Sequence, residues 1–392
     1  MYFVADTGAL VAQGVLTPAQ ADVIKNRSRE AMVALALNCL LIGGIIASTF
    51  GLVFLLADAV LVAVWGSLSV AAGLLILAKG RAAYRIFGNA SALIGAGMLA
   101  AGAGFELARS YPVVATPGMV GLGAVMAALA VGGYLKGAAQ TRFAAGAVLV
   151  MGAGLVVAGV YFGATFYAVS GWPMPAIHLV VFAIIAAVGW FLDLRIVTAL
   201  AIVPFAQMMD TGTFYRHAMY VFYSPEPTLS ILQMGALIAV CLWVARAAGP
   251  RTVRQAGVLA IMAFIVANLC FLVGSLWGDV VGQSLWGPVR VGGDHDAFVA
   301  ARDAFMARTV VIPEGVYAVI WAILLAAVAI WTAARNKRGL FNTAVTFGAI
   351  HAYTQVFESF GTAPLAYVVS GLSAIPLAWG MWRLNERFKL PA

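Results

Sequence analysis

Apolar runs, separated by short segments that carry Lys or Arg, repeat along this chain from end to end. Of its 392 residues, 63% are hydrophobic and only 10% are charged, whereas about 25% of residues in soluble domains are charged. A helix needs about 20 apolar residues to cross the hydrocarbon core of a bilayer, and backbone exposed to lipid must satisfy its own hydrogen bonds. The pattern therefore predicts an all-α, polytopic membrane protein whose solvent is the lipid bilayer.

We predict twelve transmembrane helices by cutting the chain wherever charges or Pro/Gly clusters interrupt the apolar runs. Their approximate ranges are 31–57, 59–78, 86–108, 113–135, 143–169, 173–192, 196–209, 228–245, 256–277, 311–334, 341–357 and 363–382. The same division predicts a cytosolic helical hairpin at 1–30 and a transmembrane domain at 31–392. Its outer loops are predicted near 210–227 and 278–308.

The basic residues predict the orientation of the chain, because Lys and Arg are retained in cytoplasmic loops. With both termini inside, 18 of the 23 Lys and Arg residues fall in inner segments and 5 fall outside. The net charge of +8 therefore reflects sidedness and contact with anionic lipid headgroups, and not nucleic acid binding. We predict a multi-pass protein of the bacterial inner (cytoplasmic) membrane with N-in, C-in topology.

The N-terminal segment carries helix signals and not a secretory signal, because Asp6 and Asp22 precede the first apolar run. Thr17 and Gln20 have the spacing of a capping box, and Gly14 suits the end of a preceding helix. Two interpretations of this hairpin stay open. It is either a folded anchor on the membrane surface or a docking site for another membrane subunit.

Glycine is abundant, at 42 residues, and is concentrated in the predicted spans 86–108, 113–135 and 143–169. In lipid, small residues allow helix backbones to approach one another closely. We therefore predict that these three spans form a tight cluster. Such glycine-lined faces are a second place where other membrane subunits could bind.

Sequence motifs for catalysis, metals or cofactors are missing. Cys39, Cys241 and Cys270 fall inside predicted spans without C-x-x-C spacing, so we predict that they are packing residues. There is no H-E-x-x-H, G-x-S-x-G or P-loop motif, and no two of the four histidines are spaced to ligate haem or copper on one helix. The sequence predicts no catalytic residue, no metal and no cofactor, and argues against an enzyme without deciding the question.

The seventh predicted span is unusually short. Its 14 residues would extend about 21 Å as a helix, less than the roughly 30 Å of the hydrocarbon core. It contains Pro204, and Gln207 and Asp210 are predicted to share one helix face, followed by Arg216 and His217. A short or broken span that ends in ionisable residues is typical of a substrate or ion site in transporters. The alternative is an aromatic belt at the outer interface with ordinary polar neighbours.

The eleventh predicted span carries a polar stripe. His351, Thr354, Gln355 and Glu358 recur at helical spacing, so they are predicted to lie on one face of an otherwise apolar helix. An ionisable residue inside a span faces the bundle interior or water. The stripe is interpreted either as the lining of a proton or cation path, or as a hydrogen-bond network between helices.

The longest outer loop contains Arg290 and the pair Asp294 and Asp296. Two acids at this spacing can bind a divalent cation, as in membrane enzymes that act on lipid-linked substrates. Asp296 also suits the N-cap of an interfacial helix. The alternative for this Gly-rich loop is a solvated turn.

The ends of the chain resemble a known family. The matching residues are Gly14-Val15-Leu16-Thr17-Pro18-Ala19-Gln20-Ala21, the Gly-rich early spans, and the closing segment from Gly371 to Trp382-Arg383-Leu384-Asn385. They resemble a bacterial family of predicted polytopic membrane proteins with an N-terminal helical hairpin, a domain of unknown function of the twenty-one fifty-seven type. This resemblance implies a membrane fold and no particular reaction.

Three functions are compatible with these observations. The first is transport of a small solute or ion, with Gln207, Asp210, Arg216, His217, His351, Gln355 and Glu358 as candidate binding residues. The second is an accessory or assembly subunit of a larger membrane complex. The third is an outer-face enzyme for a lipid-linked substrate, with Arg290, Asp294 and Asp296 as candidates.

Overall fold

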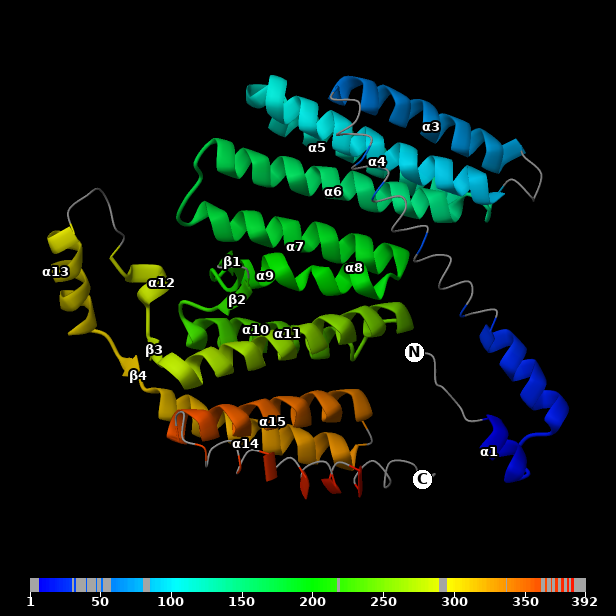
Figure 1. The fold of residues 1–392 in the computed structure, drawn as a ribbon. Coiled ribbons are helices and arrows are strands. Elements are labelled where there is room, and N and C mark those ends of the chain that lie inside the picture. The colour runs from blue at the N-terminus through cyan, green and yellow to red at the C-terminus, as the bar shows by residue number, and fades with distance from the viewer. Residues whose placement is uncertain are drawn as a thin grey trace. The chain divides into compact units, whose positions relative to one another are not determined.

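The computed structural model describes residues 7–29, 58–79, 85–216, 219–288, 295–335 and 337–360, with isolated positions between 32 and 51 and between 364 and 383. The chain forms two compact units, Met1–Ala168 and Val169–Ala392, here called unit 1 and unit 2. Both are built mainly from helices (Figure 1). The first predicted span, 31–57, and the twelfth, 363–382, lie outside the described residues apart from isolated positions.

The N-terminal hairpin has the local structure that its sequence predicts. Helix α1 (Thr7–Ala12) is followed by Gly14 in the left-handed region, with φ 72°. In the capping box, the Thr17 backbone N–H donates to Gln20 Oε1 at 3.0 Å, and the Gln20 N–H donates to Thr17 Oγ1 at 3.3 Å. The chain is then helical from residue 18 to residue 29. The predicted capping box and helix end are confirmed.

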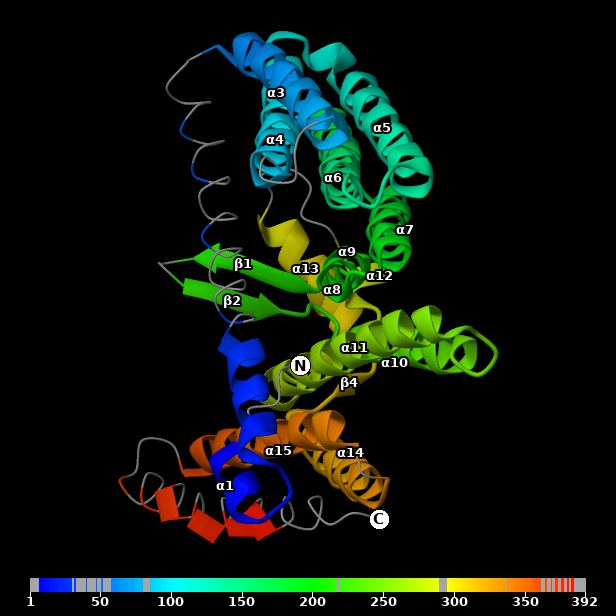
Figure 2. The same ribbon diagram turned by 90° about the vertical axis from the view of Figure 1, so that its right-hand side faces the viewer.

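From residue 58 onward, the described part of unit 1 contains four long helices. They are α3 (Ala59–Lys79), α4 (Arg85–Ser110), α5 (Pro112–Lys136) and α6 (Arg142–Phe166), close to the predicted spans. Asp58 caps α3, since its Oδ1 accepts the N–H groups of Val60 and Leu61 at 2.9 and 3.1 Å. Figures 1 and 2 both show α3 beside α4 and α5 beside α6.

Glycines set the closest helix contacts in unit 1. A Cβ placed on Gly73 of α3 would lie 2.5 Å from the Ala92 backbone nitrogen in α4, and a Cβ on Gly95 would lie 2.5 Å from the Gly66 carbonyl oxygen. A Cβ on Gly123 of α5 would lie 2.5 Å from a backbone oxygen in α6. The predicted cluster of Gly-rich helices is confirmed, but it also includes α3, because Gly66 and Gly73 form half of its closest interface.

We expect the substitution Gly73→Ala to destabilise unit 1. Its new methyl group would overlap backbone atoms that cannot rotate away, and overpacking of this kind costs about 1–3 kcal/mol. The measurement is thermal unfolding in mild detergent. Gly121→Ala is the matched control, because Gly121 lies in a helix with no heavy atom within 4 Å of the new Cβ. Equal unfolding midpoints for the two variants would contradict the close approach of α3 and α4.

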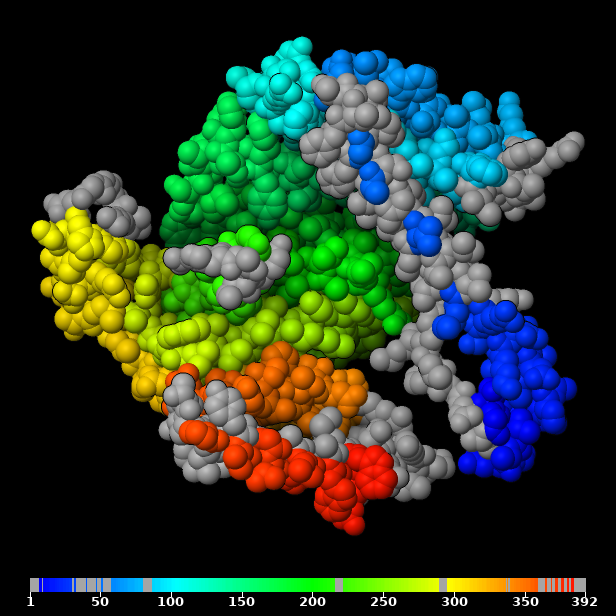
Figure 3. Space-filling model, in the orientation of Figure 1, coloured from blue at the N-terminus to red at the C-terminus, as the bar shows by residue number. Residues whose placement is uncertain are grey.

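Unit 2 surrounds one long central helix, α11. The elements follow in the order α7 (Pro173–Leu192), α8 (Arg195–Leu200), α9 (Ile202–Gln207), β1 (Gly212–Arg216), β2 (Met219–Tyr223), α10 (Pro227–Val244), α11 (Pro250–Trp277), β3 (Asp279–Val280), α12 (Gln283–Trp286), α13 (His295–Met306), β4 (Val311–Ile312), α14 (Glu314–Ala334) and α15 (Arg338–Phe360). Helix α11 packs against α10 and α9 on one side and against α14 and α15 on the other. Figure 3 shows α13, in yellow, projecting from the side of this unit.

Eight of the described helices are long and apolar enough to cross a membrane: α3, α4, α5, α6, α7, α10, α11 and α14. The polytopic, all-α class is therefore supported. Helices α8 and α9 cover the seventh predicted span and α15 covers the eleventh, but neither region meets that standard of length and hydropathy.

Two short antiparallel ribbons accompany the helices. Strand β1 pairs with β2, from Gly212 opposite Tyr223 to Arg216 opposite Met219, and β3 pairs with β4. The second ribbon corrects the predicted tenth span. Val311 and Ile312 pair with β3, so the helix begins at Glu314. The ninth span also differs from its prediction, since α11 begins earlier, at Pro250.

The seventh predicted span is broken. Its two short helices, α8 and α9, meet at Ala201. Pro204 has no N–H to donate to the carbonyl of Leu200, and its ring crowds that carbonyl. The missing hydrogen bond falls at the junction, and this accounts for the break.

Candidate functional site

Polar side chains of unit 2 gather at the two ends of α11, which at 28 residues is about 42 Å long. We call the set at its C-terminal end the carboxylate cluster: Glu226, Thr228, Asp279 and Tyr317. A second set beside it, the hydroxyl cluster, contains Thr211, Ser224 and Ser230. The set at the N-terminal end of α11 is called the basic-end network, and its main members are Trp190, Asp193, Thr198, Arg251, Thr252, Arg254 and Gln255.

In the carboxylate cluster, two acids tie together chain segments that are far apart in sequence. Asp279 Oδ2 accepts the backbone N–H of Thr228 at 2.9 Å, in the first turn of α10, and the hydroxyl of Tyr317 at 3.0 Å. Glu226 Oε1 accepts the Gly282 N–H at 2.7 Å, and its Oε2 accepts the Ser284 N–H at 3.1 Å. Asp279, just after α11, therefore binds one backbone N–H at the start of α10. Glu226, just before α10, binds two backbone N–H groups in the segment after α11.

Both acids are almost completely buried, at 4% exposure each. Among the residues that the structure describes, neither forms an ion pair, and Asp279 Oδ1 has no hydrogen-bond partner. A buried charge is normally paired, because the transfer of an isolated carboxylate out of water costs several kcal/mol. The carboxylate cluster thus holds two buried acids that form no ion pair with a basic side chain of the described residues.

The hydroxyl cluster connects the end of the broken helix to α10. Thr211 Oγ1 lies 2.6 Å from Ser230 Oγ and 3.0 Å from Ser224 Oγ, and Ser224 Oγ donates to Ser230 Oγ at 3.0 Å. All three side chains are buried. A hydroxyl can both donate and accept, so this triangle is satisfied internally and can also offer a lone pair to a neighbour.

The structure separates the residues predicted for the seventh span. Helix α9 ends at Gln207, and Asp210 lies in the following turn with φ 55°, so the prediction that these two share a helix face is wrong. The Asp210 carboxylate interacts with the Tyr223 hydroxyl of β2 and with His178 of α7. Arg216 is the last residue of β1, with a side chain outside the described part of the structure. His217 also lies outside the described residues.

The polar stripe of α15 is only partly turned inward. The His351 ring contacts the Trp321 ring edge to face, with centroids 4.8 Å apart. Two buried atoms of the stripe, His351 Nδ1 and Gln355 Nε2, find no hydrogen-bond partner within the described part of the chain. Thr354 donates to the Ile350 carbonyl of its own helix, and Glu358 is exposed. The stripe therefore meets the core through His351 and Gln355 and not through Glu358.

The two predicted groups of site residues belong to different parts of unit 2. Helix α15 packs mainly on α14 and α11, whereas α9 packs on α7, α11 and β1. The residue set that the structure assembles instead is the carboxylate cluster, which is not among the predicted site residues. In the sequence, Glu226 stands between Pro225 and Pro227, where a helix is interrupted, and Asp279 follows Gly278. The two acids are 53 positions apart.

The long outer loop gives little support to an acidic metal site. Arg290 and Asp294 lie outside the described residues. Asp296 is exposed in the first turn of α13, which begins one residue earlier, at His295, so Asp296 is not its N-cap. Within the described part of the chain, no group of three or more His, Cys, Asp or Glu side chains could hold a metal ion.

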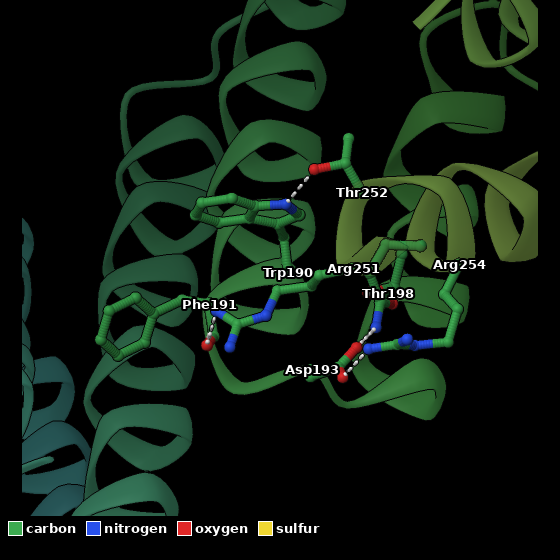
Figure 4. A network of polar contacts seen from close by, with 8 residues as sticks. Trp190, Phe191, Asp193, Thr198, Arg251, Thr252 and Arg254 are labelled. Carbon is green, nitrogen blue, oxygen red and sulfur yellow. Dashed lines mark hydrogen bonds and ion pairs between the residues drawn. The ribbon is translucent and has the colours of Figure 1, made fainter. Parts of the chain in front are cut away.

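The basic-end network joins the turn between α7 and α8 to the first turns of α11 (Figure 4). Asp193 forms an ion pair with Arg254 and accepts a hydrogen bond from Gln255 Nε2 at 2.6 Å. Thr198 Oγ1 of α8 donates to Gln255 Oε1 at 2.7 Å. Nearby, Trp190 Nε1 donates to Thr252 Oγ1 at 2.9 Å. These contacts hold one end of the broken helix against α11.

The basic-end network predicts a loss of stability in acid. Hydrogen bonds from Arg254 and Gln255 lower the pKa of the Asp193 carboxyl below its ordinary value of about 3.9. A lowered folded-state pKa adds stability above the unfolded-state pKa, and this stability is lost as the pH falls through the folded-state value. We expect the thermal unfolding midpoint in detergent to decrease as the pH is lowered below about 4 in the wild type. In Asp193→Asn this decrease should be less steep. Asp296→Asn, an exposed acid on α13, should keep the wild-type slope.

Comparison with family models, with curated proteins and with solved structures finds no match to this chain.

Proposed function

We propose that this protein is a carrier of the bacterial inner membrane that moves a small cation, alone or together with a small solute. In this proposal the chain crosses the membrane twelve times with both termini inside, and it belongs to the family of unknown function that its ends resemble. The eight apolar helices support an integral membrane protein. The choice of a cation comes from the carboxylate cluster.

The observation that carries the proposal is the buried acid pair without a basic partner. Glu226 and Asp279 lie at the ends of two apolar helices, α10 and α11, and are almost fully buried. Ionisable groups in a membrane domain are costly to place, and they usually mark ion or substrate paths. Both oxygens of Glu226 hold backbone N–H groups, whereas Asp279 Oδ1 has no such role among the described residues.

The short α8–α9 segment supports the same proposal by its length. One end of α8–α9 is held to α11 by Thr198, and the chain just beyond the other end is held to α10 by Thr211. The segment Arg195–Gln207 extends only about 20 Å as a helix, against a hydrocarbon core of about 30 Å. The hydroxyl cluster and Asp210 would then lie inside the membrane, as in carriers with discontinuous helices.

The test is cation flux into proteoliposomes that contain the purified protein. We expect uptake of ²²Na⁺, or of protons reported by an enclosed pH-sensitive dye, to exceed the uptake of empty liposomes. The double variant Glu226→Gln with Asp279→Asn should lose most of that flux. Glu358→Gln, at an exposed acid on α15, is the matched control and should transport like the wild type. Uptake equal to that of empty liposomes for both ions would overturn the proposal.

One observation favours a second function, an accessory subunit of a membrane complex. The N-terminal hairpin is held by its capping box, yet Val15 and Val23 are 63% and 56% exposed. Exposed apolar residues on a small folded hairpin suit docking on a partner or on lipid. This function predicts co-purification of a larger complex that is lost when residues 1–30 are deleted. A single monodisperse species in mild detergent, unchanged by the deletion, would contradict it.

A further inference from the structure

We propose that the carboxylate cluster binds one Na⁺ ion, with Asp279 Oδ1 as its anionic ligand. This inference rests on the proposed function, because it names the cation and the atom that holds it. Its basis is one atom, the buried Oδ1 of Asp279, for which the described residues supply no hydrogen-bond partner.

The hydrogen bonds of Asp279 to the rest of the protein are formed by its other carboxylate oxygen, Oδ2. Oδ2 accepts both the Thr228 N–H, which caps α10, and the Tyr317 hydroxyl. The Tyr317 hydroxyl also contacts Thr228 Oγ1. Oδ1 takes no part in these bonds, although the residue is only 4% exposed. Capping and packing therefore leave one buried anionic oxygen unexplained.

A carboxylate oxygen that is closed off from water is stabilised by a positive partner or by a bound proton. The ion pair between Asp193 and Arg254 lies at the opposite end of α11. The nearby side chains are instead acidic or neutral: Glu226, Thr228 and Tyr317. A cation from solution is the partner that this position lacks.

The available ligands select a small monovalent ion. The side-chain ligands of the carboxylate cluster are all oxygens, which suit hard cations. Both oxygens of Glu226 already accept backbone N–H groups, so Asp279 Oδ1 is the one wholly free anionic oxygen. Ca²⁺ takes six to eight oxygen ligands, commonly including several carboxylates, and no group of three acidic, His or Cys side chains occurs among the described residues. Na⁺, a monovalent hard cation, balances a single free charge.

Packing around the site keeps the hydroxyl of Tyr317 in place. Gly274 of α11 allows the Tyr317 ring to lie against the helix backbone, since a Cβ there would be 2.6 Å from a ring carbon. Phe271 packs against the same ring at a centroid distance of 6.3 Å. The neutral hydroxyl is thus fixed beside Asp279 and can supply a further oxygen to the ion.

The experiment measures unfolding of the full chain in mild detergent with NaCl, KCl or choline chloride at equal ionic strength. A ligand of the folded state at 100 times its dissociation constant multiplies the ratio of folded to unfolded protein by about 100. We expect NaCl to raise the unfolding midpoint above that in KCl or choline chloride. Asp279→Asn should lose this difference, and Tyr317→Phe, which keeps the ring, should reduce it. Glu314→Gln, at an exposed acid of the same membrane end, should retain it.

Equal midpoints in the three salts, or a difference that persists in Asp279→Asn, would overturn the Na⁺ site. If Asp279→Asn fails to fold, equilibrium binding of ²²Na⁺ to the wild-type protein is the deciding measurement. Binding of one ion per chain that NaCl displaces and choline chloride does not would support the site. An absence of binding would refute it. Binding without flux would refute the proposed transport and leave the site standing. Flux without binding would refute the site alone.

Discussion

Replacing Trp321 with alanine is expected to lower the free energy of unfolding of unit 2 by about 3–5 kcal/mol, the usual range for a large aromatic residue in a core. Trp321 is 1% exposed and stacks on Phe271 with ring centroids 6.3 Å apart. Its indole N–H donates to Asn268 Oδ1 at 2.8 Å. The substitution would leave a cavity between α11, α14 and α15, together with a buried amide oxygen that has lost its donor.

The control for this prediction lies on the same helix. Trp331→Ala removes an identical side chain that is 44% exposed, so its effect should be small. Trp321→Phe separates the two contributions, because it keeps most of the packing and removes the N–H. It should cost about 1–3 kcal/mol for the unsatisfied Asn268 oxygen. Equal unfolding midpoints for Trp321→Ala and Trp331→Ala would show that α14 does not pack as described.

Glu226→Ala should have the second largest effect, about 2–4 kcal/mol, and should act locally. Hydrogen bonds to a charged acceptor are worth about 1.5–3 kcal/mol each, and this substitution removes two of them, from Gly282 and Ser284. The relief of burying one carboxylate offsets part of the loss. The segment 279–288 should then open while the helix core stays folded.

Hydrogen exchange resolved by peptide is the measurement for this change. We expect faster exchange in 279–288 and unchanged exchange in the middle of α11. Glu226→Gln should show an intermediate effect, since its amide keeps one acceptor oxygen. Glu314→Ala, at an exposed acid nearby, should leave the segment protected. Protection that is the same in Glu226→Ala and the wild type would show that Glu226 does not anchor this segment.

Local features of unit 1 could be predicted from short stretches of sequence. The capping box depends only on Thr17 and Gln20, which are three residues apart, and the structure confirms it. The helices of unit 1 follow from runs of apolar residues. The partner of each helix was harder to predict, because the fit between Gly73 and Ala92 depends on how α3 and α4 are aligned.

The candidate site was largely missed because its residues are distant in sequence. Asp210, His351 and Glu358 stand out as ionisable residues near or inside predicted spans, yet the structure leaves Asp210 and Glu358 exposed. Considered one at a time, Glu226 and Asp279 do not differ from other acids at span ends. Only the antiparallel pairing of α10 with α11 brings the start of one helix to the end of the other, and so the two acids together.

Hydropathy and charge alone determined that this chain is an all-α membrane protein, because the need to satisfy backbone hydrogen bonds in lipid leaves a run of apolar residues few alternatives to a helix. The short seventh span and its proline likewise made a break foreseeable. Only the tertiary structure decided which acids lose contact with water. Burial and the supply of donors depend on neighbours from other helices, and for Asp279 those neighbours are Thr228 and Tyr317.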